Sequence, residues 1–292
     1  MNYITERYED LQRFNKQYEE IYQFLLTVAD SGYNEHFHWG RFEWMHQHTM
    51  LDIDKLDRIG IFRNTKNKIV GLVTYDTCFD DGAYLIHFND DDELLRMMID
   101  FAIRNYGENG KAVIKPNSKD LALLKTLSDC NFSKTWTEES ILELDLEKTL
   151  EFQVQEGYTI SPENFNSDNW KYQMVIHKGF DHADIPEPWS EEFFEPTPNF
   201  KKELKVFAIN EKGEYCAHCG MWYTKGNTAY VEPVVTIPEC RNTGLAKAVV
   251  YETARRAKKL GAARVIVLSG QEFYYKLGFE FSSEFECWEC KI

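Results

Sequence analysis

The sequence predicts an α+β protein made of two similarly folded halves, each a mixed, mostly antiparallel sheet flanked by helices. The main observation is that strand and helix patterns follow the order hairpin, strand, helix, strand, helix, strand, and that this order occurs twice. The length of 292 residues fits one or two domains. The composition, 43% hydrophobic and 28% charged, is that of a globular chain. We expect domains over 1–147 and 158–292.

The first half is predicted to begin with helices and to continue with strands. Residues 15–29 have the apolar spacing of an amphipathic helix, and residues 35–50 form an aromatic-rich helix. A polar turn at 64–68 separates two strand patterns, which indicates a hairpin. The predicted strands are 58–63, 69–75, 83–88, 111–115 and 141–146, and the later helices are 93–105 and 121–127.

The second half repeats this order of elements. Its predicted strands are 205–209, 215–223, 229–237, 264–268 and 279–290, and its helices are 244–260 and 271–276. The four prolines within residues 170–200 argue against any regular element there. That segment is either a surface loop fixed by its aromatic side chains or the cover of a binding site, since long irregular loops are often functional.

The strand, turn and helix over 229–260 are the features that point most directly to function. Pro238 ends the strand because proline has no N–H to donate. Arg241 and Gly244 then occupy a tight turn at the start of the helix. The first N–H groups of a helix have no partner within it, and the helix dipole is positive there. The turn therefore predicts an anion site suited to a pyrophosphate. The alternative is an ordinary turn with an incidental arginine and glycine.

The corresponding helix start in the first half has the opposite charge. Asp90, Asp91, Asp92 and Glu93 stand where the second half has its arginine and glycine. Acidic side chains cap a helix themselves and repel a phosphate. We expect the first half to bind no phosphate-bearing ligand. It would serve as a scaffold, as the surface of a possible homodimer, or as one wall of an acceptor pocket.

Two groups of residues resemble metal ligands, but the pattern favours packing roles. The cysteines with C-x-x-C spacing are Cys216/Cys219 and Cys287/Cys290. Both pairs fall in predicted strands, where residues three apart point to opposite faces. The histidines of the aromatic-rich segment are His36, His38, His46 and His48. Those spaced two apart do not share a helix face. We therefore predict no metal site.

Charge and hydropathy narrow the classes of partner. The net charge of −15 argues against a nucleic-acid surface and is compatible with an amine-bearing small molecule. No apolar run reaches the roughly 18 residues that a membrane span requires. The first residues carry no apolar signal segment, and the odd number of cysteines fits a reducing compartment. We therefore expect a cytoplasmic protein that binds no membrane.

The motifs over 204–281 resemble those of the GNAT superfamily of acetyl-CoA-dependent acyltransferases. R-N-T-G-L-A at 241–246 matches its (Arg/Gln)-x-x-Gly-x-(Gly/Ala) turn, and F-Y-Y-K-L-G-F at 273–279 is similar to its closing motif. The resemblance implies tandem GNAT-like domains, of which the first is degenerate. It also implies acetyl-CoA as cosubstrate, held by Val234, Val235 and Thr236 along the strand and by Arg241, Asn242, Thr243, Gly244, Leu245, Ala246 and Lys247 at the turn.

The resemblance also suggests two catalytic residues. Glu232 lies two residues before Val234, where burial would raise its pKa, so it is either the general base or a group that orients the amine. Tyr274 matches the family tyrosine that protonates the departing thiolate. Many relatives carry a longer segment before the closing motif, and a side chain of that segment contacts pantetheine. Here Ser269–Glu272 runs directly into the closing motif, and Gln271 would take over that contact.

Three functions are compatible with these features. The leading one is an N-acetyltransferase that acts on a primary amine and has one working site in the second half. The second is a non-catalytic acyl-CoA-binding or regulatory protein. The third is an aminoacyl transferase that uses charged tRNA, against which the acidic charge and the intact turn both argue.

Overall fold

The computed structural model describes residues 3–9, 11–30, 37–88 and 90–292 of the chain, and these fall into two compact units. Unit 1 comprises 1–142, 268–270 and 281–292, and unit 2 comprises 143–267 and 271–280. The sequence placed the whole of 158–292 in the second domain. The units divide the chain differently because the last strand, Glu280–Lys291, pairs with Lys111–Ile114 of unit 1.

Unit 1 contains a four-stranded antiparallel sheet in the order β1-β2-β3-β4 and a second group of strands. Its helices include α3, which packs against β2, β3 and β4. The elements are β1 Ile4–Arg7, α1 Lys16–Asp30, α2 Trp39–Gln47, β2 Gly60–Arg63, β3 Ile69–Thr74, β4 Tyr84–His87, α3 Asp92–Tyr106, β5 Lys111–Ile114, α4 Leu121–Asp129, most of β6 Ser133–Asp145 and most of β12 Glu280–Lys291.

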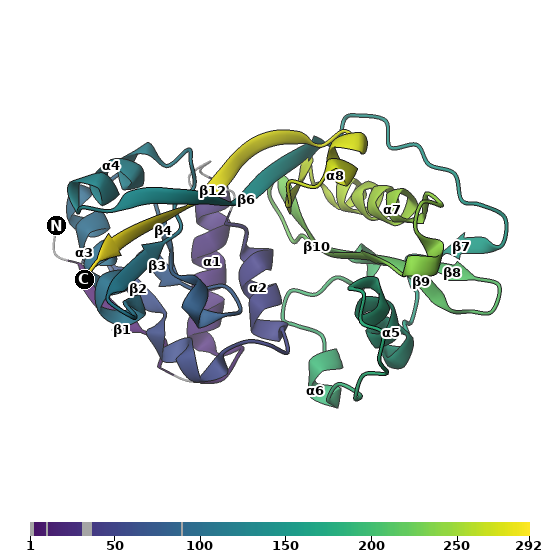
Figure 1. Ribbon diagram of the computed structural model, residues 1–292, viewed down its shortest axis with the longest axis horizontal. Coiled ribbons are helices and arrows are strands. Elements are labelled where there is room, and N and C mark those ends of the chain that lie inside the picture. Colours follow the sequence, from purple (N-terminus) through teal and green to yellow (C-terminus); the bar gives the residue numbers. More distant parts are fainter. Residues whose placement is uncertain (1–2, 10, 31–36, 89) are drawn as a thin grey trace. The chain divides into compact units, whose positions relative to one another are not determined.

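Unit 2 is built on strands in the order β11-β10-β9-β8-β7, which pair antiparallel except for the parallel pair β10 and β11. Helices α5 and α7 pack on opposite faces of these strands (Figure 1). The elements are β7 Tyr158–Ile160, α5 Asn169–Gly179, α6 Glu191–Phe194, β8 Lys205–Asn210, β9 Tyr215–Trp222, β10 Thr228–Thr236, α7 Leu245–Leu260, β11 Arg264–Leu268 and α8 Glu272–Lys276.

The helices and strands that the sequence predicted are present, and the mixed α+β fold is confirmed. The prediction that the prolines of 170–200 allow no regular element there was wrong, because α5 and α6 form in this segment. Helix α5 forms because Asp168 caps its start, accepting a hydrogen bond from the Lys171 N–H, and because it ends before the first proline. Strand β6 starts at Ser133, well before the predicted 141, and strands β1 and β7 were missed.

The packing roles predicted for cysteine and histidine agree with the structure. All seven cysteines are free, and Cys216, Cys219 and Cys287 are buried in strands. His46 is buried among aromatic rings, and loss of water lowers its pKa to about 4. His36 lies outside the described residues. No helix in the described part of the chain is long and apolar enough to cross a membrane.

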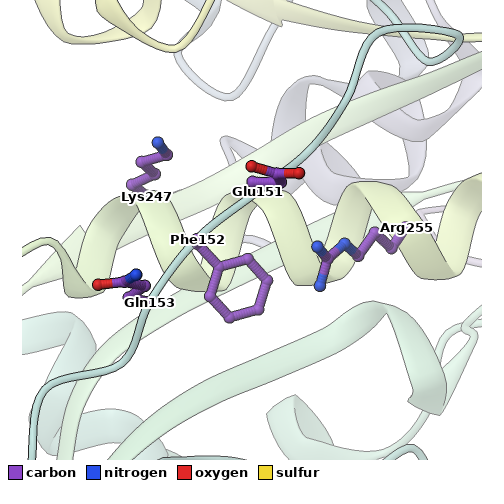
Figure 2. A pocket seen from close by; sticks show the side chains of 5 residues that line it. All are labelled: Glu151, Phe152, Gln153, Lys247 and Arg255. Carbon is purple, nitrogen blue, oxygen red and sulfur yellow. The ribbon is translucent and has the colours of Figure 1, made fainter.

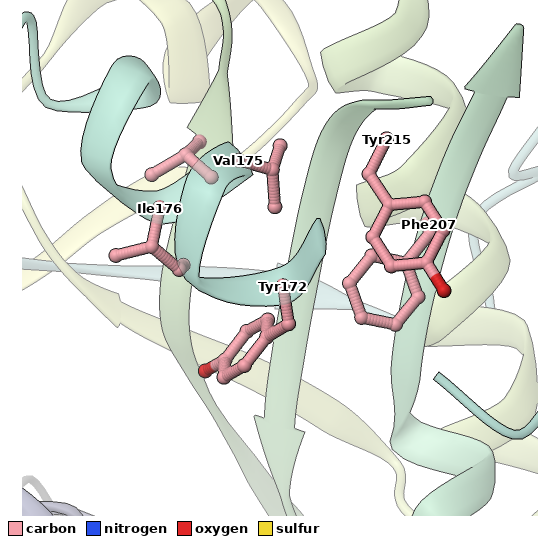
Figure 3. Close-up of a cluster of buried hydrophobic side chains, with 6 residues drawn as sticks. Tyr172, Val175, Ile176, Phe207 and Tyr215 are labelled. Carbon is pink, nitrogen blue, oxygen red and sulfur yellow. The ribbon is translucent and has the colours of Figure 1, made fainter. Parts of the chain in front are cut away.

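The core between α5 and the sheet combines aromatic and aliphatic side chains (Figure 3). Its buried members are Tyr172, Val175, Ile176, Phe207, Tyr215 and Val235. His218 of β9 stacks on the Phe207 ring, with ring centroids 4.5 Å apart, and its Nδ1 lies 2.9 Å from the Val206 carbonyl oxygen. Burial is the main cause that lowers the His218 pKa, to about 3, and the nearby Lys205 charge lowers it further.

This buried histidine predicts a loss of stability in acid. The unfolded chain takes up a proton at His218 near its usual pKa of about 6.5, whereas the folded chain does not until about pH 3. The His218 contribution to the free energy of unfolding should therefore fall by about 2 kcal/mol from pH 7 to pH 5. Denaturant titrations of wild type and His218→Asn test this, since the variant should show a shallower pH dependence. If the free energy of unfolding changed equally with pH in wild type and in the variant, His218 would not be the source of the acid sensitivity.

Candidate functional site

Strand β10 carries a bulge at the centre of unit 2. Its pairing with β9 shifts between Val231 and Val234, so that Glu232 and Pro233 together oppose the single residue Gly220. A Cβ at Gly220 would lie 2.7 Å from the Glu232 carbonyl oxygen and 3.2 Å from Pro233 Cδ. The Trp222 Nε1–H donates to the same carbonyl oxygen at 3.1 Å. Glycine is thus required where the bulge approaches β9.

Replacing Gly220 with alanine should destabilise unit 2 and displace the bulge, because the new methyl group meets backbone rather than a movable side chain. We expect a loss of about 1–3 kcal/mol in the free energy of unfolding, measured by denaturant titration. Gly270→Ala is the matched control: its Cβ would meet the Ser140 hydroxyl at 3.2 Å, which can rotate away. Equal effects of the two substitutions would argue against a tight contact at the bulge.

Beyond the bulge, β10 leaves its parallel neighbour. The pairing with β11 covers Thr228–Tyr230, and the described chain shows no β11 partner for the rest of β10. One backbone edge of Val234–Thr236 therefore has no strand partner among the described residues, as strand addition by an extended ligand requires. The Val235 side chain belongs to the core beneath α5, whereas Val234 and Thr236 are half-buried. The buried Thr236 hydroxyl has no hydrogen-bond partner among the described residues.

The turn that follows β10 has the backbone of an anion site. Asn242 and Gly244 both have positive φ, 62° and 84°. Gly244 is the N-cap of α7 and provides no side-chain cap, and no atom of the described residues outside its chain neighbours lies within 4 Å of the position that a Cβ would take there. The Thr243 hydroxyl donates to the Cys240 carbonyl oxygen at 2.6 Å and shapes the turn. Leu245 anchors α7 in the core, and Ala246 and Lys247 complete its open first turn.

The Arg241 side chain is held at the end of α5. Its guanidinium donates to the carbonyl oxygens of Thr236 at 3.2 Å and Gly179 at 2.9 Å. It also forms an ion pair with Asp181, at 2.9 Å. In this arrangement Arg241 ties the turn to α5, and a phosphate contact by the same guanidinium would compete with Asp181.

A pocket of about 500 Å³ lies beside the first turns of α7. Figure 2 shows the connecting segment 151–153 crossing the helix, with Phe152 between Lys247 and Arg255. The Arg255 guanidinium lies 4.6 Å from the centre of the Phe152 ring. Glu151 and Gln153 complete the lining. Lys247 thus belongs both to the turn and to a basic, aromatic pocket that the sequence gave no reason to expect.

The two predicted catalytic residues lie within electrostatic range of each other. Glu232 is half-buried, and its Oε2 accepts a hydrogen bond from the Tyr230 hydroxyl at 3.4 Å. Tyr274 of α8 is 7% exposed, whereas the adjacent Tyr275 is 44% exposed. Burial raises the Tyr274 pKa, and the charges of Cys219 and Glu232 raise it further. The phenol therefore stays protonated at neutral pH, where it can serve as an acid but not as a base.

The helix start in unit 1 that corresponds to the start of α7 is capped by an acidic side chain, as predicted. Asp91 caps α3 and accepts hydrogen bonds from the N–H groups of Glu93 at 3.0 Å and Leu94 at 3.2 Å. The Tyr3 hydroxyl donates to Asp91 at 2.8 Å, and this bond is the main cause that lowers the Asp91 pKa. A carboxylate thus occupies the start of α3, where a phosphate would have to bind.

One part of the chain matches the model of a known protein family. Residues 172–279 match the model of the Acetyltransferase (GNAT) family, a range that contains β8 to β11 and the turn at Arg241–Gly244. No curated protein matches the sequence.

The solved structures that resemble this chain share its fold over most of its length. A GCN5-related N-acetyltransferase from Sphaerobacter thermophilus is 11% identical, with a TM-score of 0.58, 99% of this chain covered and 95% of that one. A tandem GNAT protein from the clavulanic acid biosynthesis pathway is 11% identical, with a TM-score of 0.56 and coverages of 99% and 98%. A GCN5-related N-acetyltransferase from Kribbella flavida is 16% identical, with a TM-score of 0.52 and coverages of 75% and 86%. At these identities the likeness shows the tandem GNAT fold alone.

Proposed function

We propose that this chain belongs to the acetyltransferase (GNAT) family, whose model matches residues 172–279, and that unit 2 transfers an acetyl group from acetyl-CoA to a primary amine of a small molecule. The observation that carries this proposal is the continuity of β10 with α7. A strand edge that has no β11 partner in the described part of the chain runs directly into a glycine turn that opens the start of a helix.

The coenzyme would be held by backbone more than by side chains. The N–H groups at the start of α7, from Gly244 onward, would bind the pyrophosphate. The edge of Val234–Thr236 would pair with the extended pantetheine arm, and the Thr236 hydroxyl would gain a partner there. The pocket at Phe152 adds the positive charges of Lys247 and Arg255 within reach of the coenzyme's nucleotide end. These features fit an anionic, extended ligand.

The chemistry would use the residues around the bulge. Acetyl-CoA supplies an activated thioester. Glu232 would orient the acceptor amine or take its proton, and the acidic carboxylate also favours a cationic acceptor over an anionic one. Tyr274, kept protonated by its raised pKa, would donate to the departing sulfur. Both residues belong to unit 2, so the proposal assigns unit 1 no catalytic group.

A thiol-release assay with acetyl-CoA and a panel of primary amines tests the proposal. We expect turnover with at least one amine and its loss, by roughly 100-fold, in Glu232→Gln if this residue is the base. A smaller change in kcat with a raised KM would identify Glu232 as the group that binds the amine. Coenzyme binding without turnover on any amine would favour the alternative of a non-catalytic acyl-CoA-binding protein.

A further inference from the structure

The end of helix α5 brings together three side chains with metal-ligand chemistry. His177, His182 and Asp184 each offer one ligand atom, and these atoms all lie within 4.8 Å of one another. His177 is half-buried, and the other two are exposed. Within the described ranges no other group of three histidine, cysteine or acidic residues meets the same test. None of the three takes part in the acetyl-transfer site proposed above.

The backbone explains why the two histidines are neighbours. Helix α5 ends in a turn in which Asp181 has a positive φ of 64°. The N–H of His182 bonds back to the His177 carbonyl oxygen at 3.2 Å, and the Asp181 N–H bonds to the Lys178 carbonyl oxygen at 3.0 Å. This is the Schellman pattern of bonds, which folds the chain back over the last helical turn. It therefore presents His182 beside His177 through local structure alone.

The distances match a metal site. The two imidazole centroids are 4.7 Å apart. With N–metal bonds of about 2.1 Å, two imidazoles on one metal have centroids roughly 4.5–5.2 Å apart for angles between 90° and tetrahedral. His177 Nε2 lies 3.0 Å from Asp184 Oδ1, and the separation of adjacent ligands at such bond lengths is about 3.0–3.4 Å. In the metal-free protein the proton on Nε2 makes this contact as a hydrogen bond.

We propose that His177, His182 and Asp184 bind one divalent transition metal ion of the zinc, nickel or cobalt class. Two imidazole nitrogens and one carboxylate oxygen suit these ions better than calcium or magnesium, which prefer oxygen ligands alone. The remaining coordination positions would be filled by water, since two of the ligands are exposed. The sequence does not reveal this site by itself, because the spacing His-x4-His-x-Asp brings the three ligands together only through the turn at Asp181.

A metal ion at this site would also restrain the turn at Arg241–Gly244. Gly179 and Asp181, which hold the Arg241 guanidinium, lie between the two histidine ligands in the chain. Closing a chelate across this segment would therefore limit the motion of the residues that fix Arg241. Metal binding itself does not depend on the proposed acetyltransferase activity, so the two proposals can fail separately.

Calorimetry with Zn²⁺ and absorption spectroscopy with Co²⁺, on protein without a histidine tag, test the site. We expect one ion per chain, a cobalt spectrum without a thiolate charge-transfer band, and a melting temperature that rises with Zn²⁺. Affinity should fall at least tenfold in His182→Ala and in Asp184→Asn, both substitutions at exposed positions. His48→Ala, in unit 1, is the matched control and should bind like wild type.

Three results would overturn the proposal. They are the absence of Zn²⁺ binding to wild type, a thiolate band in the cobalt spectrum that assigns the ion to cysteine, and equal affinity in wild type and His182→Ala. Melting curves of each variant without metal identify any loss of fold, and Asp184→Asn, which preserves the side-chain shape, gives the answer if His182→Ala is unstable.

Discussion

Replacing Tyr274 with phenylalanine should lower kcat by about 100-fold while leaving the Kd for acetyl-CoA within about threefold of wild type. The phenol is buried on α8 and contacts the rings of Phe273 and Phe279, with centroids 5.0 and 5.5 Å away. Phenylalanine fills the same space, so the substitution removes the proton donor and little else. Steady-state kinetics with an accepted amine, together with calorimetry for the coenzyme, separate these two effects.

The adjacent tyrosine provides the control. Tyr275→Phe changes the same group on the exposed side of α8 and should leave kcat unchanged. Because the Tyr274 pKa is raised, its phenol should stay protonated throughout a neutral pH profile. If activity falls as the pH rises toward about 10, another group causes the fall. The midpoint of that fall should therefore be the same in wild type and in Tyr274→Phe. An unchanged kcat in Tyr274→Phe would remove this residue from the mechanism.

Glutamate at position 244 should abolish measurable coenzyme binding, raising the Kd by more than about 100-fold. Two effects combine. A side chain at φ 84° costs about 1–2 kcal/mol in the turn, and a carboxylate there repels the pyrophosphate at the positive end of α7. A factor of 100 corresponds to about 2.8 kcal/mol, which the two together readily supply. Calorimetric titration with acetyl-CoA measures it.

Two further substitutions separate strain from charge. Gly244→Ala introduces the strain without the carboxylate and should weaken binding less. Gly261→Ala introduces a similar strain, at φ 115°, at the other end of the same helix, where it should lower stability without changing the Kd. Coenzyme binding by Gly244→Glu as tight as by wild type would show that the turn does not hold the pyrophosphate.

The elements whose local pattern decides their structure could be predicted from the sequence. The turn at Arg241–Gly244 is one, because a positive φ at Gly244 and an open helix start are local properties. The acidic cap at Asp91 is another, because the carboxylate bonds to N–H groups two and three residues away. Helix α5 was missed because the prolines that follow it outweighed its capping residue Asp168 in the sequence pattern.

The rest of the candidate site depends on contacts between distant segments. The residues around Gly220 do not indicate that a Cβ there would lie 2.7 Å from the Glu232 carbonyl oxygen. A glycine inside a strand signals only that some backbone approaches closely. The Arg241 ion pair with Asp181 joins residues sixty positions apart. The assignment of the last strand to unit 1 follows from its pairing with β5, which neither segment indicates alone.

The stoichiometry of acetyl-CoA binding to the intact chain tests the central claim most directly. We propose that the open helix start of α7 binds the diphosphate and that the carboxylate at the start of α3 excludes it from unit 1. Calorimetry should therefore give one coenzyme per chain, with binding that Asp91→Asn leaves unchanged. Two equivalents per chain, or no binding at all, would contradict the account.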